Sequence, residues 1–484
     1  MKKIFVLLLA ACLMLSLLAC GGSEPAGSAP KGTEAKPAET AGMKVGYGRA
    51  NITPEYSVPL AGYGNTSMRM STSFQTYLYS NCVAVSDGEN TVLMFNNDLT
   101  YLNNIIVENA RDEIHAKYGI PQENIMLAAT HNHSAPDIGN SAEGNITKYN
   151  QQLVGWMTEA AGIALEDMKP CTGMYHGSCN PEGLNFIRHY VLEDGTFKGD
   201  NFGDLNPSPY AGHTHDVDNQ LQVLKFTREG GEDVIMVNWQ THPHRGGGGS
   251  NTIITADLCG VMVTHMEERL GAHVAYFTGA AGNVNPSSRI DEENLTKDYW
   301  EQGKTLGNYA IQVLEGEMTQ LEQGKIQVVT KKYTGETDHS EDHLVPYAVE
   351  VQALWTKNND FIEAVTLANT YGINSPYHAG SIITKAGMPN TYTMEIAAVS
   401  IGDFGIACAP FEMFDENGRY IKENSPFGAT FVMELCNGSN GYIPSEEGYR
   451  IRCYEANTGK FKPGTGEIVA DEYVKLLEQL YAAK

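Results

Sequence analysis

The sequence is short of positive charge. It has 33 lysine and arginine residues against 58 aspartate and glutamate residues, a formal net charge of −25 at pH 7. Such a surface repels nucleic-acid phosphates and gains little from anionic lipid headgroups. We therefore expect no nucleic-acid partner, and we expect any membrane attachment to depend on something other than a basic surface.

Two further absences narrow the class of protein. None of the nine cysteines is spaced as C-x-x-C, so no thiolate zinc site is indicated. Seven of them lie beyond residue 20, an odd number that leaves at least one thiol unpaired, and Cys171 and Cys179 are the only close pair. No repeat of 20–50 residues is present, which excludes a solenoid.

The N-terminus reads MKKIFVLLLAACLMLSLLAC, two lysines followed by an apolar stretch too short to span a membrane. It resembles a bacterial lipoprotein signal peptide (residues 1–20) with Cys20 as the lipidated residue; the alternative is an ordinary secretory signal. Residues 21–43 are rich in Gly, Pro, Ala and Ser, and we expect a disordered tether. These features predict an extracytoplasmic chain at the cell envelope, held to the membrane through Cys20, with one catalytic domain over 44–484.

The remainder alternates helical and strand-like stretches, which predicts an α/β fold with mixed sheets flanked by helices. Gly119 and Pro121 mark the end of the first helix. We expect helices over 101–119, 255–271, 360–372 and 466–483, and strands over 124–130, 233–239, 273–279, 404–410 and 429–435. The stretch 325–395 shows secondary structure but no evident chemistry.

Each of the five expected strands is followed by a polar segment. In sheets flanked by helices, ligands bind beyond the carboxyl ends of the strands, where the loops converge. We therefore expect one site at these strand ends. The segments are THNHSAP (130–136), THPH (241–244), GNVNP (282–286), Phe411-Glu412 and NGSNGYIP (437–444).

Two histidine pairs favour a metal, because a catalytic zinc takes nitrogen and oxygen ligands and keeps one position open. His131 and His133 form an H-x-H pair, and His242 and His244 form an H-P-H pair; a polar loop with hydrogen-bonded histidines is the alternative for the first pair. Glu412 is a surface charge, a charge at a helix N-terminus or a ligand. The RGGGGS segment (245–250) is either a mobile loop or a lid.

Several segments together resemble the neutral (non-lysosomal) ceramidase family, from Val45 to the C-terminus. The opening VGYGRANITPEYSVPLAGYG is similar to that family's start, and THNHSAP is similar to T-H-T-H-S-G-P. NWQTHPH resembles N-W-x-x-x-H-P, GNVNP resembles G-D-V-S-P, and NGYIPSEEGYRIRCYEA resembles G-Y-x-x-[ST]-x-x-x-Y…Y-E. The order and spacing of these segments are specific even though each is short.

The resemblance implies a zinc-dependent amidohydrolase that cleaves an N-acyl bond by metal-activated water. Its substrate would be a small N-acyl compound, including sphingolipids. The implied zinc ligands are His131, His242, Glu412 and Tyr442. The implied catalytic residues are His133, for hydrogen bonding or proton transfer, and Arg188 and Tyr454, for the oxyanion.

Two departures from the family pattern qualify this reading. Asn285 stands where the family has the serine of G-D-V-S-P, so a serine acyl-enzyme is ruled out there and a hydrogen-bonding role remains. The expected closing helix leaves no room for the family's C-terminal immunoglobulin-like domain, which puts a lipid substrate in doubt. The alternatives are a hydrolase of a non-lipid amide or ester, and a non-catalytic lipid-anchored binding lipoprotein.

Overall fold

The computed structural model describes residues 42–484 except 64–68, 140–144, 201 and 204. The predicted signal peptide, Cys20 and nearly all of the predicted tether lie outside the described residues. Residues 41–484 form one compact unit. Among the described residues, no helix combines the length and the apolar character needed to cross a membrane.

The larger of two main sheets has nine strands and mixes parallel with antiparallel pairing. Its order is β14-β12-β11-β6-β1-β3-β4-β5, with β16 paired to β6. The pairs β4/β5 and β12/β14 are parallel. The strands are β1 (Lys44–Asn51), β3 (Tyr79–Ser86), β4 (Thr91–Asn97), β5 (Ile125–Ala129), β6 (Lys169–Cys179), β11 (Leu221–Arg228), β12 (Val234–Trp239), β14 (His273–Thr278) and β16 (Thr319–Leu321).

The second sheet has four strands in the order β17-β18-β19-β21, and its β19/β21 pair is parallel. Shorter strands lie in the connections. The sheet strands are β17 (Ile326–Glu336), β18 (Thr391–Ile401), β19 (Phe404–Cys408) and β21 (Ala429–Met433). The short strands are β2 (Ser73–Phe74), β7 (Phe186–Ile187), β8 (His189–Leu192), β9 (Phe197–Gly199), β10 (Tyr210–His213), β13 (Ile253–Ile254), β15 (Val284–Asn285), β20 (Glu412–Met413) and β22 (Tyr442–Ile443).

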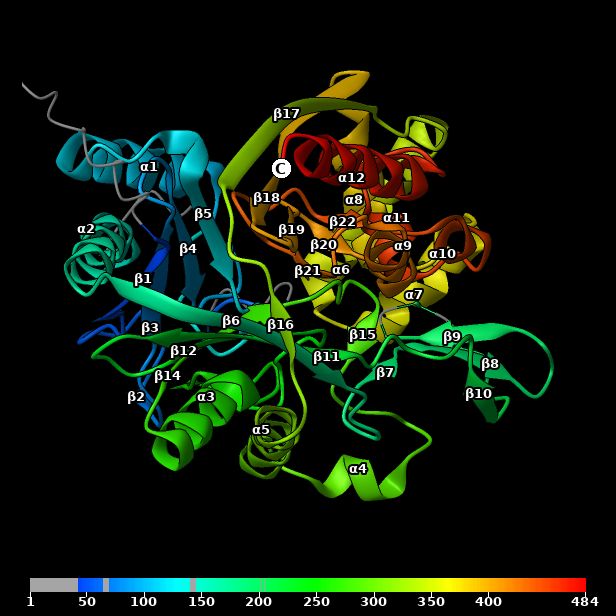
Figure 1. The fold of residues 1–484 in the computed structure, drawn as a ribbon. Helices are drawn as coiled ribbons and strands as arrows, with labels where there is room; N and C mark the ends of the chain where they lie inside the picture. The colour runs from blue at the N-terminus through cyan, green and yellow to red at the C-terminus, as the bar shows by residue number, and fades with distance from the viewer. Residues whose placement is uncertain (1–41, 64–68, 140–144, 201, 204) are drawn as a thin grey trace, which may run out of the picture. The chain divides into compact units, whose positions relative to one another are not determined.

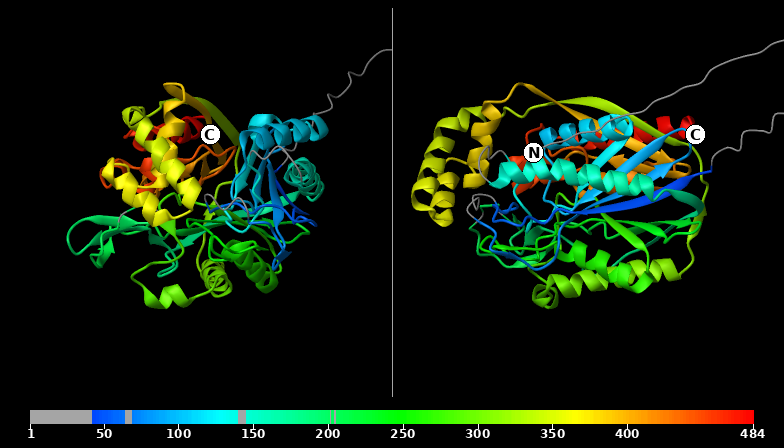
Figure 2. Two further views of the ribbon diagram at one scale, coloured as in Figure 1. Left: turned by 180° about the vertical axis from the view of Figure 1, so that it is seen from behind. Right: turned by 90° about the vertical axis from the view of Figure 1, so that its left-hand side faces the viewer.

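Helices cover the outer faces of both sheets (Figures 1 and 2). The pair α1/α2 and the pair α3/α5 cover the nine-stranded sheet, and α12 covers the four-stranded sheet. The helices are α1 (Asn104–Tyr118), α2 (Asn145–Glu166), α3 (Asp257–Leu270), α4 (Glu292–Thr296), α5 (Tyr299–Glu315), α6 (Val345–Asn358), α7 (Phe361–Thr370), α8 (Pro376–Ala386), α9 (Asp415–Asn424), α10 (Glu446–Arg450), α11 (Tyr454–Thr458) and α12 (Thr465–Ala482). The predicted α/β class with mixed sheets flanked by helices is confirmed.

Alternation along the strands produces the layered core. In β3, Cys82 and Ala84 pack beneath α1 and α2, whereas Val83 and Val85 pack towards the four-stranded sheet. This period of two is what a strand buried on both faces requires. Local sequence signals set both ends of the helices. Helix α1 begins after Asn103, whose side chain accepts a hydrogen bond from the Ile106 N–H, and it ends at Gly119, which adopts φ 72°.

The seven cysteines in the described part of the chain are free thiols. Cys171 and Cys179, the close pair in sequence, lie at opposite ends of the single strand β6, so they cannot meet. The other five described cysteines are buried as small core residues. Disulfides therefore play no part in positioning the site.

The fold also buries a carboxyl group at the end of β4. Asp98 is 6% exposed, its Oδ2 accepts a hydrogen bond from the Tyr79 N–H at 2.8 Å, and burial raises its pKa to about 7. The unfolded chain releases this proton near pH 4, so Asp98 lowers the stability of the fold progressively as the pH rises from about 4 to about 7.

Asp98→Asn should therefore stabilise the protein in a pH-dependent way. The amide keeps an oxygen to accept the Tyr79 hydrogen bond but cannot ionise. The gain in free energy of unfolding, measured by chemical denaturation, should be roughly 2 kcal/mol larger at pH 8 than at pH 5. An equal gain at both pH values would contradict the assignment of a raised pKa to Asp98.

Candidate metal centre

The curvature of the large sheet brings its two end strands together. Although β5 and β14 stand at opposite ends of the strand order, they are in contact, and the Thr278 hydroxyl donates to the Thr130 carbonyl at 2.9 Å. The four-stranded sheet joins them through β21, where the Glu434 N–H donates to the Thr278 carbonyl at 3.0 Å. The carboxyl ends of β5, β14 and β21 thus meet, as the polar segments in the sequence predicted.

Two histidines project from this meeting point in fixed orientations. Nδ1 of His131 lies 2.9 Å from the Thr100 carbonyl oxygen, and Nδ1 of His242 lies 3.1 Å from the Val284 carbonyl oxygen. A carbonyl only accepts, so each Nδ1 carries the proton and, in the neutral ring, each Nε2 holds a lone pair. His131 adopts φ 66°, a backbone conformation uncommon outside glycine and enriched at functional sites.

The carboxylate of Glu412 completes a close cluster. Its Oε2 lies 3.3 Å from Nε2 of His131 and 3.3 Å from Nε2 of His242. This oxygen is buried and accepts no hydrogen bond from any residue in the described part of the chain. The parallel pairing of β20 with β22 places Tyr442 directly beside Glu412.

Charge in the cluster follows from burial. Burial and the nearby Arg188 lower the pKa of His242 to about 3, so this imidazole is neutral at pH 7. Burial alone would raise the pKa of Glu412, but His131 and His242 hold it well below its ordinary value, so the carboxylate is ionised. Burial raises the pKa of Tyr442, and Glu412 raises it further, which leaves a neutral phenol.

This donor set fits a zinc ion. Nε2 of His131 and Nε2 of His242 each lie 3.3 Å from the same carboxylate oxygen, Oε2 of Glu412. Bonds of about 2 Å at tetrahedral angles place neighbouring ligand atoms about 3.3 Å apart. A cation among these atoms would relieve their repulsion and satisfy the otherwise unpartnered Oε2 of Glu412.

His133 lies at the edge of this cluster. Its Nε2 is 3.2 Å from Nε2 of His131, and its Nδ1 is buried without a partner among the described residues. Burial and the neighbouring histidines lower the pKa of His133 well below its ordinary value, so its ring is neutral. One ring nitrogen from each of His131, His133 and His242 lies within 4.8 Å of the other two, close enough for the three to share a cation.

Arg188 lies on another side of the cluster. It is the single residue that connects β7 to β8 along the chain, and it is buried. Its Nη1 lies 3.2 Å from Nε2 of His242, its Nη2 donates to the Gly282 carbonyl at 2.7 Å, and its Nε donates to Glu455. Its guanidinium carbon lies 5.5 Å from the centre of the Tyr442 ring. Tyr454, the other predicted oxyanion residue, has its ring centre 5.9 Å from that of Tyr442.

Asn285 has an acceptor role and a donor role. Its Oδ1 accepts a hydrogen bond from Nε2 of His244 at 3.1 Å, and its Nδ2 donates to Oδ2 of Asp200 at 2.8 Å. His244 belongs to the H-P-H pair but was assigned no role from the sequence. The adjoining RGGGGS loop is tied to the body of the protein, since the Tyr63 hydroxyl donates to the Gly247 carbonyl and also lies 3.1 Å from the His244 carbonyl oxygen.

Asn285→Ala should cost about 1–2 kcal/mol of stability, because it removes hydrogen-bond partners of the half-buried side chains of His244 and Asp200. Asn308→Ala is the matched control, since Asn308 pairs with Nε2 of His265 at 2.8 Å on the exposed surface. Urea denaturation of both variants checks this expectation. Equal stabilities for the two would show that the Asn285 bonds contribute nothing.

Two further residues near the cluster escaped the sequence analysis. Glu455 binds Arg188 through one oxygen and Nε2 of His189 through the other, at 2.9 Å. Glu434 accepts hydrogen bonds from the Ala281 and Met413 N–H groups, at 3.0 and 3.2 Å, and burial raises its pKa well above the ordinary value. The only signal for Glu455 was its place next to Tyr454, and Glu434 carried none.

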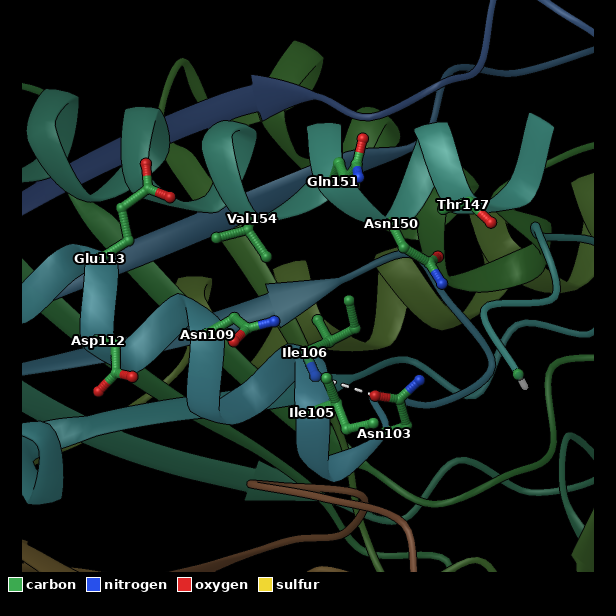
Figure 3. A pocket seen from close by; sticks show the side chains of 11 residues that line it. Asn103, Ile105, Ile106, Asn109, Asp112, Glu113, Thr147, Asn150, Gln151 and Val154 are labelled. Carbon is green, nitrogen blue, oxygen red and sulfur yellow. Dashed lines mark hydrogen bonds between the residues drawn. The ribbon is translucent and has the colours of Figure 1, made fainter. Parts of the chain in front are cut away.

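Other polar clusters and cavities differ from this centre. In a group of His215, Asp415 and Glu416, Nε2 of His215 is hydrogen-bonded to Oδ1 of Asp415 at 3.1 Å and lies 3.8 Å from Oε1 of Glu416. A pocket of about 760 Å³ lies between α1 and α2 and is lined by side chains of both helices, among them Asn109 and Gln151 (Figure 3). No histidine lines this pocket, so it offers no comparable donor set.

Residues 43–288 match the N-terminal domain of the neutral/alkaline non-lysosomal ceramidases. The chain belongs to this family. The matched range contains His131, Arg188, His242 and Asn285 but ends before Glu412, Tyr442 and Tyr454. The family resemblance inferred from the sequence is therefore confirmed.

Individual relatives agree with this membership. The chain is 23% identical to the neutral ceramidase of Pseudomonas aeruginosa over 297 residues, which is 60% of this chain but only 41% of that protein. The crystal structure of neutral ceramidase from Pseudomonas aeruginosa superposes with a TM-score of 0.68 at 18% identity, covering 91% of this chain and 74% of that one. A ceramidase complexed with C2 gives 0.66 at 17% identity, covering 92% and 76%.

Proposed function

We propose that the protein is a zinc-dependent hydrolase that cleaves the amide bond of an N-acyl compound, as a ceramidase does. The observation that carries the proposal is the cluster of His131, His242 and Glu412, in which each imidazole Nε2 lies 3.3 Å from Oε2 of Glu412, in a chain of this family. Tyr442 is the fourth proposed ligand because strand pairing sets it beside Glu412. The neutral ceramidase of Pseudomonas aeruginosa supports the substrate class.

In this proposal the protein groups around the ligands have distinct tasks. A zinc ion bound there would polarise the amide carbonyl and acidify a water molecule. His133, with its unpartnered Nδ1, or Glu412 would accept a proton. Arg188 and Tyr454 would stabilise negative charge on the carbonyl oxygen. Asn285 has no nucleophilic hydroxyl, so the reaction proceeds without an acyl-enzyme at this position.

Zinc content is the decisive test. The full chain purified without chelator should carry about one zinc ion per molecule, hydrolyse a fluorescent N-acyl sphingosine, and lose both zinc and activity on dialysis against a chelator. The melting temperature should fall with the metal, since an ion bound only to the folded state stabilises it. A chain without stoichiometric zinc would refute the enzymatic proposal and favour a binding lipoprotein. Zinc with activity only on non-lipid amides or esters would refute the lipid substrate.

We propose further that the chain is anchored to the membrane through a lipid on Cys20, outside the cytoplasm. The apolar stretch ending in Leu-Ala-Cys supports this location. Cys20→Ser should shift the protein from the membrane fraction to the soluble fraction of the cell envelope, as followed by immunoblotting. Equal fractionation of the variant and the natural chain would contradict lipid anchoring at Cys20.

A further inference from the structure

A row of aromatic rings leads away from the candidate metal centre. It begins at Tyr442, passes to Tyr454 at 5.9 Å between ring centres, and reaches Tyr377 at a further 5.8 Å. Tyr377 contacts Trp355 at 5.1 Å and Phe361 at 5.8 Å. The row thus connects β22 and α11 with three separate helices.

The outer rings come from a helical layer inserted between β17 and β18. Trp355 lies in the last turn of α6, Phe361 begins α7 and Tyr377 lies in the first turn of α8, so three helix ends converge. Figure 1 shows α8 beside α11, and the two helices are in contact. This layer has its own small core and lies outside the residues that match the family.

The exposure of these rings is not that of core packing. All five side chains are half-buried, whereas the core aromatic residues Phe411, Phe414 and Tyr473 are at most 1% exposed. These partly buried rings, each in contact with the next, form a continuous apolar strip that keeps some of its surface exposed. Strips of this kind on soluble proteins mark binding sites.

The ring angles indicate which ligand suits the strip. Tyr442 and Tyr454 meet at 72°, Tyr454 and Tyr377 at 84°, and Tyr377 and Trp355 at 76°. Edge-to-face packing gives a corrugated wall without the broad flat face on which a sugar ring stacks. A flexible methylene chain follows such a wall and buries its apolar surface at each ring.

We propose that this strip is a subsite for the acyl chain of the substrate and that Tyr377, Trp355 and Phe361 determine the preferred chain length. The inference rests on the proposed N-acyl hydrolase function. The acyl half is assigned here because the strip begins at Tyr442 and Tyr454, and Tyr454 is the residue proposed to contact the carbonyl oxygen of the acyl group. A short acyl group ends near Tyr454, whereas a long one reaches α8 and α6.

The test compares N-acetyl, N-hexanoyl and N-dodecanoyl sphingosine as substrates of the full zinc-loaded chain. For the natural chain, kcat/KM should rise with acyl length. In Tyr377→Ala and Trp355→Ala the ratio of kcat/KM for dodecanoyl over acetyl substrate should fall about tenfold, and Tyr377→Phe should keep it. Tyr371→Ala is the control, since Tyr371 stacks on Tyr347 in the same helical layer but outside the row.

The outcomes separate this inference from the proposed function. Hydrolysis without acyl-length preference, an unchanged ratio in both alanine variants, or a preference that follows the length of the amine instead would overturn the subsite and leave the hydrolase standing. Calorimetric titration with dodecanoate and hexanoate provides a test that needs no turnover. The natural chain should bind dodecanoate more tightly than hexanoate. If Tyr377→Ala bound dodecanoate as tightly as the natural chain does, the subsite would also be overturned.

Discussion

Replacing His131 with alanine should abolish stoichiometric zinc binding and reduce amide hydrolysis by about a thousandfold or more. Each protein ligand adds to the affinity for zinc and holds the ion in place, so the loss of one of the four proposed ligands would leave a weakly bound and misplaced ion. The change also removes the residue whose φ of 66° is held by the surrounding structure. Metal analysis of the purified variant and initial rates with an N-acyl sphingosine measure both effects.

The control for this prediction is His265→Ala. His265 lies on α3, and its Nε2 pairs with the exposed Asn308 side chain. It belongs to none of the groups assigned to the metal centre. It should retain zinc and activity within twofold of the natural chain. If His131→Ala kept a full equivalent of zinc and its activity, the proposed ligand set would be wrong.

Glu455→Gln should impair both stability and turnover through Arg188. The Glu455–Arg188 ion pair is buried. Arg188 and His189 hold the pKa of Glu455 well below its ordinary value against the effect of burial, so the carboxylate is charged. The neutral amide of glutamine would leave the guanidinium charge of Arg188 uncompensated. We expect a loss of about 3 kcal/mol in free energy of unfolding. Because Arg188 loses its orientation, kcat should fall about a hundredfold with a smaller change in KM.

A second glutamate offers a matched comparison. Glu447 pairs with Arg450 through both oxygens on the exposed surface. Glu447→Gln should change stability by less than about 1 kcal/mol and leave kcat as it is, because exposed pairs contribute little. Denaturation and steady-state kinetics, measured on Glu455→Gln and Glu447→Gln side by side, test this difference. Similar losses in both variants would show that the Glu455 pair has no special role in positioning Arg188.

The positions of helices and strands could largely be predicted from the sequence because local periodicity sets them. The expected strand 273–279 is β14 (His273–Thr278), and the expected helix 466–483 is α12 (Thr465–Ala482). Strand pairing could not be predicted in the same way. Nothing local in the sequence indicates that β5 and β14, at opposite ends of the strand order, meet beneath β21.

The site residues likewise differ in whether a local signal in the sequence could predict them. The histidine pairs at the ends of β5 and β12 carry a local signal, a polar segment after an apolar run, and the structure brings His131 and His242 to the same carboxylate. Glu412 and Tyr442 were placed in the site by family resemblance, since a lone carboxylate and a lone phenol have several structural roles. Glu455 was missed because its partner Arg188 lies 267 residues away.

The helical layer shows another limit. Residues 325–395 gave secondary structure but no chemistry, because Trp355, Phe361 and Tyr377 look like ordinary core residues at helical spacing. Only the converging ends of α6, α7 and α8 reveal that their rings continue the line from Tyr454. A feature assembled from helix ends has no period for sequence reasoning to detect.

The distribution of the proposed ligands over both sheets bears on how the protein matures. His131 and His242 follow strands of the large sheet, whereas Glu412 and Tyr442 follow strands of the small one. If these four side chains hold the ion, the complete site forms only after both sheets have docked, and uptake of the ion would then be one of the last events of folding. The fraction of molecules carrying the ion would then report the fraction that has finished folding.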